Sequence, residues 1–505
     1  MSTIQPSITR HLSGALLLAA GTLYLGFGVD RQQFWSLFGA FVVAFGGYLA
    51  IVYRANERYL KHLIVLGILL RIVLVFAFPL LSDDVYRFIW DGNLIVAGEN
   101  PFAHLPAYYL EAGNEVAGLT PELFAKLNSP DYYTIYPPIA QAVFTASAWG
   151  SPGSWYGAAV VMKLFLLLCE LGTLWVMWRL LARTQVQGKV EKSNDQRHRL
   201  LLYWLNPLII VEITGNLHFE GAMVFFLLLA YYLLQRSRLV AGAVAMAASV
   251  ASKLLPLMLL PFLIRRLWKT APQPLSGGEG LQENAGRFRT HDSRRESRLP
   301  SPSDLGADSK RPAEKPRSER GPGRGFLHFF LFSLTFGIAT LFFFLPFLLS
   351  PDFLEGFQSS LELYQRKFEF NASLYYLARA YGYFDVGWNQ IAIFGPMLAK
   401  ASAVGILLIA LLDRRSDWAS LATGWLFAFV LYLLCATTVH PWYLSVPIAL
   451  CVFTRWRFPL LWSFLIMLTY TNYLTVPYEE NLWLVAAEYV LVAGFGIWEW
   501  RRCMS

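Results

Sequence analysis

Two adjacent carboxylates, Asp83 and Asp84, directly follow an apolar stretch at residues 63–81. Acidic side chains at the end of a spanning helix lie at the depth of lipid headgroups, where charge is costly but functional. A carboxylate placed there can accept a proton from an attacking hydroxyl. It can equally cap a helix that begins near residue 84, because carboxylates favour helix N-termini. Both roles stay open, and one acid can cap while the other faces a substrate.

The residues after this couplet predict a surface helix and a long loop. Stretch 84–98 (DVYRFIWDGNLIVAG) has the pattern of an amphipathic helix lying along a membrane interface. A Pro- and Tyr-rich loop follows and ends near Tyr136. Such a loop can form a pocket that is open to lipid on one side and to water on the other. We therefore interpret 82–135 as an outer catalytic loop, with Arg87 and Tyr136 as substrate-binding residues.

More polar side chains occur in short turns on the same predicted side of the membrane. Polar groups between short spans are costly to bury and are usually functional. Taken singly, each is better explained as an interfacial residue with satisfied hydrogen bonds. Lys163 and Glu170 lie seven residues apart on one helix face, and we give them a structural role. Taken together, the turn residues predict a substrate-binding set: Asn216, His218, Glu220, Lys253, Arg366, Lys367, His440, Trp442 and Tyr443.

The elements that must position these residues are membrane helices. The chain of 505 residues is 56% hydrophobic and only 15% charged, whereas soluble domains carry about 25% charged residues. A spanning helix needs about 20 apolar residues. The sequence predicts an all-α polytopic bundle of about 13–15 transmembrane segments. The long candidates are 13–29, 34–53, 63–81, 155–182, 327–349, 388–412, 418–437, 458–474 and 481–500, and the shorter runs are 136–150, 200–214, 221–234, 239–250, 254–264 and 441–454.

Basic residues set the predicted orientation. The net charge of +8 comes from short loops beside apolar runs and from one hydrophilic insert, which indicates membrane topology and not nucleic-acid binding. Loops rich in Lys and Arg are cytoplasmic, which puts 82–135 on the outer side. This holds only if 136–150 dips into the membrane without crossing it, because otherwise the loop at 183–199 changes sides.

The insert divides the chain into two bundles. Residues 270–325 are rich in Ser, Pro, Gly, Arg and Glu and have almost no aliphatic residues. Such a composition predicts disorder, because too little apolar area can be buried to offset the ordering entropy. We expect a transmembrane bundle at 1–265, a disordered basic cytoplasmic loop at 266–325 that acts as a spacer or a regulatory tail, and a second bundle at 326–505.

Several sequence blocks together resemble the GT-C superfamily of polytopic glycosyltransferases. The chain looks most like the GPI mannosyltransferase I catalytic subunit and the bacterial polyprenol-phosphate-mannose-dependent mannosyltransferases. The resemblance covers most of residues 60–265, with the first two spans outside it, and returns near the C-terminus. Its blocks are SDDVYRFIWDGNLIVAGENPF (82–102), TIYPPIAQ (134–141), KLFLLLCE (163–170), YWLNPLIIVEITGNLHFEGAMVFFLLLAYYLL (203–234), SKLLPLMLLP (252–261) and HPWYL (440–444).

The resemblance implies a reaction and a base. It implies transfer of a hexose, mannose by preference, from a polyprenyl-phosphate donor to a lipid or glycan acceptor outside a bacterial inner membrane. The family's base is an acid in the first outer loop, and aligning Tyr86-Arg87 selects Asp83, with Asp84 as a close rival. The family's spaced acid pair is replaced here by adjacent acids. Mg²⁺ or Mn²⁺ between the two carboxylates and the phosphate is a further option.

The expected chemistry is attack by an acceptor hydroxyl on C1 opposite the phosphate, which inverts the anomeric configuration. Cations that hold the leaving phosphate are Arg87, Lys253 and His440, with Arg366 and Lys367 behind them. A secondary transporter or a flippase of lipid-linked saccharides is the alternative, since short broken helices occur there too. A non-catalytic scaffold of an envelope assembly complex is a third reading.

Overall fold

A computed structural model describes residues 6–53, 57–182, 196–269, 323–475 and 477–504. Within these ranges every named element is a helix, and the extended chain contributes only one isolated parallel bridge, between Phe370 and Thr438. The all-α polytopic fold predicted from the sequence is therefore confirmed. The expected loop at 266–325 falls mostly on 270–322, outside the described residues, and its flanks are helical.

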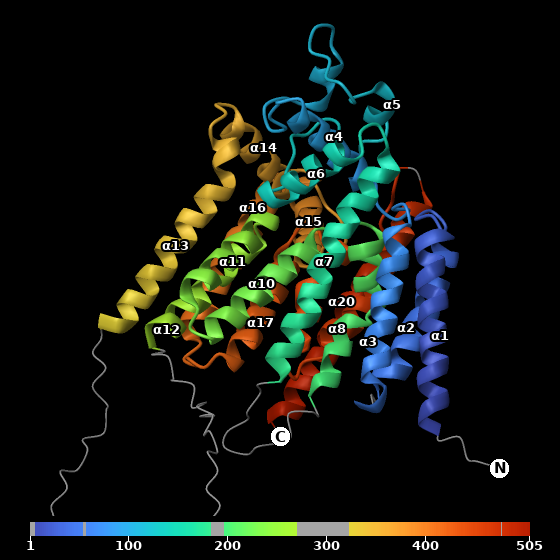
Figure 1. Cartoon of the computed structure of the whole chain (residues 1–505), viewed down its shortest axis with the longest axis vertical. Coiled ribbons are helices and arrows are strands. Elements are labelled where there is room, and N and C mark those ends of the chain that lie inside the picture. Colours follow the sequence, from blue (N-terminus) through green and yellow to red (C-terminus); the bar gives the residue numbers. More distant parts are fainter. Residues whose placement is uncertain (1–5, 54–56, 183–195, 270–322, 476, 505) are drawn as a thin grey trace, which may run out of the picture.

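Four long helices of the N-terminal half run the height of the bundle (Figure 1). They are α1 (Pro6–Phe27), α2 (Phe34–Val52), α3 (Glu57–Val75) and α7 (Trp155–Leu181). One end of the bundle carries the loop that follows α3, and we call it the loop end. The start of α1 and the end of α20 lie toward the opposite end (Figure 1), which we call the terminal end.

The number of long spans is lower than the sequence suggested. In the described part of the chain, five helices are long and apolar enough to cross a membrane, or six if the bent pair Pro207–Gly215 and Glu220–Gln235 counts as one span. The expected 13–15 segments included shorter runs, several of which form helices of 10–17 residues or broken turns. The five long helices are Phe34–Val52, Trp155–Leu181, Gly325–Leu348, Ile391–Leu412 and Leu482–Arg502.

Short helices build the loop end. They are α4 (Asp84–Val96), η1 (Pro106–Leu110), α5 (Pro121–Phe124) and α6 (Pro138–Gly150). Helix α4 packs so closely on α6 that a Cβ on Gly92 would lie 2.3 Å from the backbone oxygen of Phe144. With 13 residues, α6 extends about 20 Å at 1.5 Å per residue, too short for the apolar core of a bilayer. It stays beside α4 (Figure 1), which fits the expected dip better than a full crossing.

The middle of the chain is broken into short pieces that bend by 112° between η3 and α10. Such breaks at membrane depth are tolerated where protein covers them or where they line a cavity. The pieces are η2 (Arg197–Leu200), α8 (Leu201–Trp204), α9 (Pro207–Ile209), the π-helix η3 (Ile210–Gly215), α10 (Glu220–Gln235), α11 (Leu239–Ser252), η4 (Leu255–Leu259) and α12 (Pro261–Lys269).

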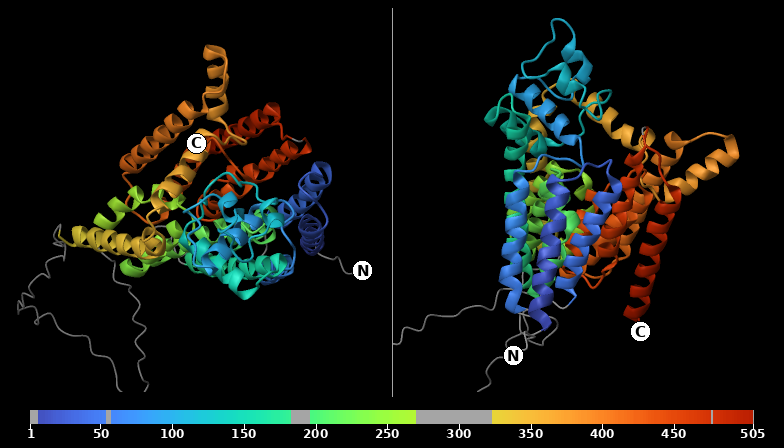
Figure 2. Two further views of the ribbon diagram at one scale, coloured as in Figure 1. Left: turned by 90° about the horizontal axis from the view of Figure 1, so that it is seen from above. Right: turned by 90° about the vertical axis from the view of Figure 1, so that its right-hand side faces the viewer.

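The C-terminal helices form the adjoining half of the bundle, as the view from above shows (Figure 2). Helix α13 is largely exposed to the surroundings, as a lipid-facing helix must be, with 11% of its apolar window buried. The elements are α13 (Gly323–Leu348), α14 (Phe353–Arg366), α15 (Leu374–Val386), α16 (Ile391–Leu412), α17 (Ala419–Cys435), η5 (Pro441–Leu444), α18 (Ser445–Cys451), α19 (Phe458–Leu465), η6 (Ile466–Leu474) and α20 (Leu482–Met504).

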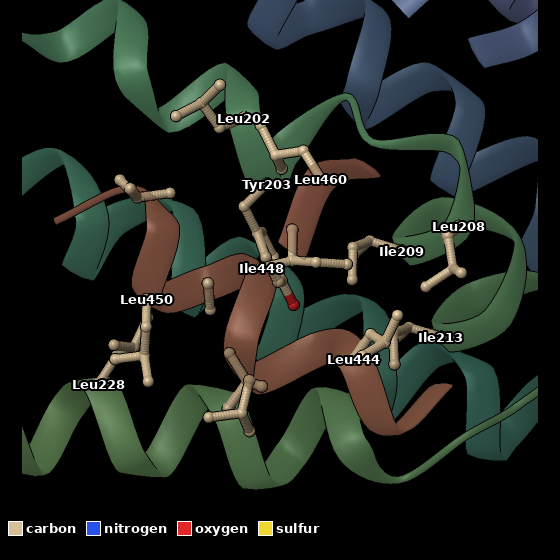
Figure 3. Close-up of a cluster of buried hydrophobic side chains, with 14 of the residues drawn as sticks. Leu202, Tyr203, Leu208, Ile209, Ile213, Leu228, Leu444, Ile448, Leu450 and Leu460 are labelled. Carbon is tan, nitrogen blue, oxygen red and sulfur yellow. The ribbon is translucent and has the colours of Figure 1, made fainter. Parts of the chain in front are cut away.

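The core lies where the broken middle segment meets the C-terminal half. Leu208, Ile209 and Ile213 of the broken segment lie near Leu444 and Ile448 of η5 and α18, all fully buried (Figure 3). Apolar contact between two distant parts of the sequence therefore fixes the turn at 215–220, which the next subsection describes.

Buried charges tie the N-terminal helices together. Glu170 of α7 accepts hydrogen bonds from Arg71 at 2.9 and 3.1 Å and from the Tyr203 hydroxyl at 2.7 Å. The Lys163 ammonium donates to the carbonyls of Ala77, Leu74 and Gly215. These contacts confirm the structural role predicted for Lys163 and Glu170.

Candidate active site

A cavity of about 310 Å³ lies at the loop end of the bundle. Segments from both halves of the chain line it. They are α4, the residues just before α6, the turn before α10, the α11–η4 junction, α14, α16, the end of α17 with the residues after it, and η5. Its polar or charged lining side chains are Asp84, Tyr136, His218, Glu220, Ser252, Lys253, Ser402, Tyr432, Thr437, Thr438 and Tyr443.

Asp84 presents its carboxylate to this cavity. One oxygen, Oδ1, accepts a hydrogen bond of 2.7 Å from the Asn128 amide, which the 99–135 loop supplies. The other oxygen, Oδ2, lies 4.0 Å from Nε2 of His218. The backbone N–H of Asp84 donates to the Ser82 hydroxyl at 3.3 Å, so Ser82 fills part of the predicted capping role.

Asp83 is occupied by a different partner. It stands at the N-cap position of α4 without a capping hydrogen bond from its side chain, and it forms an ion pair with Arg31 from the α1–α2 loop. Burial raises the pKa of Asp83, and the Arg31 guanidinium acts against that rise. Among the described residues, the cavity lining includes Asp84 and not Asp83.

The turn at 210–220 aims His218 into the cavity. It opens with a π-helix, a feature that occurs mostly at functional sites. Leu217, fully buried, then adopts φ 69°, a left-handed conformation that costs a branched residue free energy. His218 Nδ1 lies 2.9 Å from the carbonyl oxygen of Glu212 and 3.3 Å from its carboxylate.

A stack of rings supports His218 from behind. Its imidazole lies on Trp442 with ring centroids 3.7 Å apart, and Trp442 lies on His440 at 4.5 Å. The ring centroid of Phe370 lies 4.7 Å from that of His440. The backbone of Phe370 is hydrogen-bonded to the backbones of Thr437 and Val439. Burial lowers the pKa of His440 to about 3, and the nearby His218 and Lys253 act in the same direction. His440 is thus a neutral packing ring at physiological pH.

A cation faces the cavity from the α11–η4 junction. Lys253 forms an ion pair with Glu220 and lies 5.1 Å from the ring centre of Tyr443. Oε2 of Glu220 is buried and finds no hydrogen-bond partner among the described residues. This side of the cavity therefore combines the Lys253 ammonium group with the Glu220 carboxylate, one oxygen of which has no hydrogen bond among the described residues.

Six residues of the predicted binding set are absent from the cavity lining. His440 and Trp442 form the ring stack behind His218, and His440, with its lowered pKa, is not the phosphate-holding cation that the sequence predicted. The other four lie elsewhere. Arg87 is buried against Asp91 at 2.8 Å and donates to two loop carbonyls, so it organises the 99–135 loop. Asn216 joins the Leu81 backbone to Glu212. Arg366 and Lys367 are exposed at the end of α14, where Arg366 lies 3.8 Å from Glu362.

Three residues that contact the site carboxylates or His218 were not singled out from the sequence: Arg31, Asn128 and Glu212. Glu212 carried a usable signal, because an acid within an apolar run is a functional candidate. Arg31 and Asn128 are ordinary loop residues in the sequence, and only the fold brings them to the couplet.

The described residues contain no group of three or more His, Cys, Asp or Glu side chains arranged to hold a metal ion. The Asp83 carboxylate pairs with Arg31 and that of Asp84 with Asn128, so the two acids have separate partners. We assign no step to a metal.

Comparison with known proteins places the chain beside membrane sugar transferases. Residues 22–269, just under half of the chain, match the family described as alpha-(1->6)-mannopyranosyltransferase, N-terminal domain. Alpha-(1->6)-mannopyranosyltransferase B of Corynebacterium glutamicum is 25% identical over 150 residues, which are 30% of this chain and 23% of that protein. The match thus spans about a quarter of this relative's length.

These matches confirm the predicted resemblance to GT-C-like mannosyltransferases, and they indicate a glycosyltransferase. They correct its extent in one respect. The family match begins at residue 22 and so includes the α1–α2 loop with Arg31 and all of α2, which the sequence comparison of motifs had left outside.

Proposed function

We propose that this protein is an inverting glycosyltransferase that moves mannose from a polyprenyl-phosphate donor to a lipid or glycan acceptor. The observation that carries the proposal is a single cavity between helices with a carboxylate, Asp84, and an ammonium group, Lys253, in its lining. Transfer from a lipid phosphate needs both groups, a base for the attacking hydroxyl and a cation for the leaving phosphate.

Asp84 is the proposed base. As the acceptor oxygen bonds to C1 of the sugar, its proton passes to Asp84 and the C1–O bond to phosphate breaks, with the electron pair leaving on the phosphate. The Asn128 bond supports the choice, because an amide donor holds the carboxylate in place and leaves Oδ2 facing the cavity. Asp83, the first choice from the motif alignment, is held by Arg31 and we give it the role of positioning α4.

Lys253 is the proposed partner of the donor phosphate. The phosphate approaches beside Glu220, and the ammonium remains between the two anions. The lipid chain follows α16, which lines the cavity with the small residues Gly395, Ala399 and Ser402. Only 22% of the apolar window of α16 is buried, so this helix adjoins the lipid phase.

The names of the similar proteins suggest the linkage. Both describe alpha-(1->6)-mannopyranosyl transfer, and we extend that linkage to this chain. An α product formed with inversion requires a donor in which mannose is β-linked to phosphate. The acceptor hydroxyl is then a primary 6-hydroxyl.

We place the site on the outer side of a bacterial inner membrane. Three exposed arginines lie outside the cavity lining: Arg414 between α16 and α17, Arg455 between α18 and α19, and Arg501 in the last turn of α20. By the positive-inside rule these positions face the cytoplasm. The transporter alternative gains no support from the matches, since both name mannosyltransferases.

The test uses purified full-length protein with a panel of polyprenyl-phosphate sugars and a mannoside acceptor. We expect consumption of the mannosyl donor and an α-linked product. Asp84→Asn should lower the rate by about 10²–10⁴-fold, the contribution of a general base, and Asp83→Asn by less. Uptake of solute into proteoliposomes without donor consumption would favour the transporter. Wild-type rates in both variants would exclude the couplet from catalysis.

A further inference from the structure

His218 lines the cavity, and its two ring nitrogens have different surroundings. Both groups near its Nδ1 are acceptors, the carbonyl oxygen and the carboxylate of Glu212, so Nδ1 carries the proton. In the neutral ring, Nε2 then holds a lone pair. The side chain is 2% exposed, and Nε2 finds no hydrogen-bond partner among the described residues.

The local structure around the His218 ring indicates that it binds a ligand. The strained Leu217, the π-helix before it and the stack on Trp442 all restrict the position of His218. Strain of this kind persists where the surroundings over-determine it and is concentrated at functional sites. An unpartnered acceptor that is buried and lines a cavity costs free energy until a donor binds it.

The acceptor on His218 faces a second acceptor. Asp84 Oδ2 lies 4.0 Å from Nε2, beyond hydrogen-bond distance, and neither atom supplies a proton to the other when the imidazole is neutral. Two fixed acceptors at this spacing are satisfied by a molecule that brings two donors side by side. Neighbouring hydroxyl groups of one sugar ring meet this requirement, whereas a lipid alcohol or a serine side chain supplies a single hydroxyl.

We propose that Nε2 of His218 determines specificity for the sugar acceptor: the reacting hydroxyl binds Asp84, and a neighbouring hydroxyl of the same sugar residue binds Nε2. The inference rests on the proposed function and names the group that selects the acceptor. In the transfer step the reacting oxygen bonds to C1, its proton goes to Oδ2 of Asp84, and the phosphate leaves with the bonding electrons. His218 keeps its Nδ1 proton and only accepts a hydrogen bond, so it selects and orients the acceptor.

The rest of the cavity suits a sugar ring. Phe88, Tyr136 and Tyr443 contribute aromatic side chains to the lining of the same cavity as His218 and Asp84. Phe88 is itself held edge-on against Tyr136 at 4.8 Å between ring centroids. Rigid aromatic side chains with a polar tip can contact the apolar face of a sugar and its hydroxyls together.

The experiment compares octyl α-mannoside with its 2-, 3- and 4-deoxy analogues, with polyprenyl-phosphate mannose as donor. With wild-type protein, one deoxy analogue should lose on the order of 10-fold in kcat/KM, because Nε2 is left without a donor. The ratio of kcat/KM for octyl α-mannoside to kcat/KM for that analogue should fall to near one in His218→Phe. This substitution keeps a ring on Trp442 and removes the acceptor atom. Since each ratio compares two substrates with one preparation, a loss of folded protein in the variant cancels.

Three results would overturn the inference. They are equal rates for wild-type protein with all analogues, discrimination that survives in His218→Phe, and a one-hydroxyl alcohol such as octanol that serves as well as the mannoside. His218→Gln, whose side-chain oxygen is again an acceptor, should restore part of the ratio. If wild-type protein consumes no polyprenyl-phosphate sugar with any acceptor, the proposed function itself fails, and that outcome is distinct from transfer that is blind to the neighbouring hydroxyl.

Discussion

The two wall charges of the cavity, Glu220 and Lys253, can be separated by substitution. Lys253→Met leaves the Glu220 carboxylate buried without its ion-pair partner, so we expect both lower stability and a donor KM raised on the order of 10-fold. The double variant Glu220→Gln with Lys253→Met removes the stranded charge. It should recover the melting temperature but not the donor KM.

Melting temperature and donor-dependent kinetics, measured on the same preparations, check this prediction. Lys61→Met, which changes an exposed lysine at the start of α3, is the matched control and should alter neither quantity. If the double variant regains the wild-type donor KM, Lys253 has only a structural role and the phosphate binds elsewhere.

At this scale the sequence singled out six of the eleven polar or charged side chains that line the cavity, but not the use of each group. They are Asp84, Tyr136, His218, Glu220, Lys253 and Tyr443. The choice between Asp83 and Asp84 depends on Arg31, which lies 52 residues before Asp83 in the sequence. Arg87 looked like a phosphate ligand because its own partners, a loop carbonyl pair and Asp91, become neighbours only in the fold.

Between elements, Lys163 joins the end of α3 to the π-helix η3. Its ammonium donates to carbonyls of the α3 end and to Gly215 at 2.6 Å. Helix ends leave carbonyls unsatisfied, and a cation there is favourable. We expect Lys163→Met to cost about 2–4 kcal/mol, because a buried unsatisfied group costs about 1–3 kcal/mol and several are created.

Chemical or thermal unfolding in detergent measures this cost, with Lys400→Met on the exposed side of α16 as the control. Activity should fall further than stability alone explains, because η3 leads into the turn that aims His218. A variant as stable as wild type would show that water or backbone adjustment replaces the ammonium.

The loop before α20 gives the fold a pH-dependent contact. Glu480 accepts bonds from the Asn371 backbone at 2.7 Å and from the Asn472 side chain at 3.1 Å. Burial raises its pKa from 4.5 to about 7, with Glu369 adding to the rise and the Asn371 bond opposing it. Between these values the folded protein holds a proton that the unfolded chain has released, so stability should fall as pH rises through this window.

Melting temperatures at a series of pH values from about 4.5 to 8 test the prediction. Glu480→Gln should remove this part of the pH dependence, and Glu479→Gln, at the exposed neighbouring position, should keep it. An unchanged pH profile in Glu480→Gln would mean that Glu480 stays ionised in the folded protein.

Element types were more predictable than element boundaries. Most long apolar runs became helices near the expected ranges, since hydrophobic length is a strong signal. The exception is 458–474, which divides into the short α19 and the 3-10 helix η6. The short runs were harder, because hydropathy cannot tell a short span from a broken one. The π-helix η3 and the 112° bend after it arise from tertiary contacts across the core, and no local pattern encodes them.

For the whole molecule, the separation of the loop end from the terminal end decides where the reaction takes place. The 99–135 loop and the loop between α16 and α17 lie at opposite ends of the bundle (Figure 1). The bias of basic residues predicts this arrangement, and the short α6 fits the expected dip at 136–150. The assignment of the loop end to the outer side is therefore open to direct measurement.

Single cysteines at Ala117 and Arg414, both exposed, report on the two ends. Cys169, Cys435 and Cys451 are buried and can be retained, so only Cys503 needs replacement by serine. In intact spheroplasts an impermeant maleimide should label Ala117→Cys and leave Arg414→Cys unlabelled until the membrane is opened. Because a polyprenyl chain keeps its phosphate at one leaflet, the opposite pattern would move the donor to the cytoplasmic leaflet and contradict an outer active site.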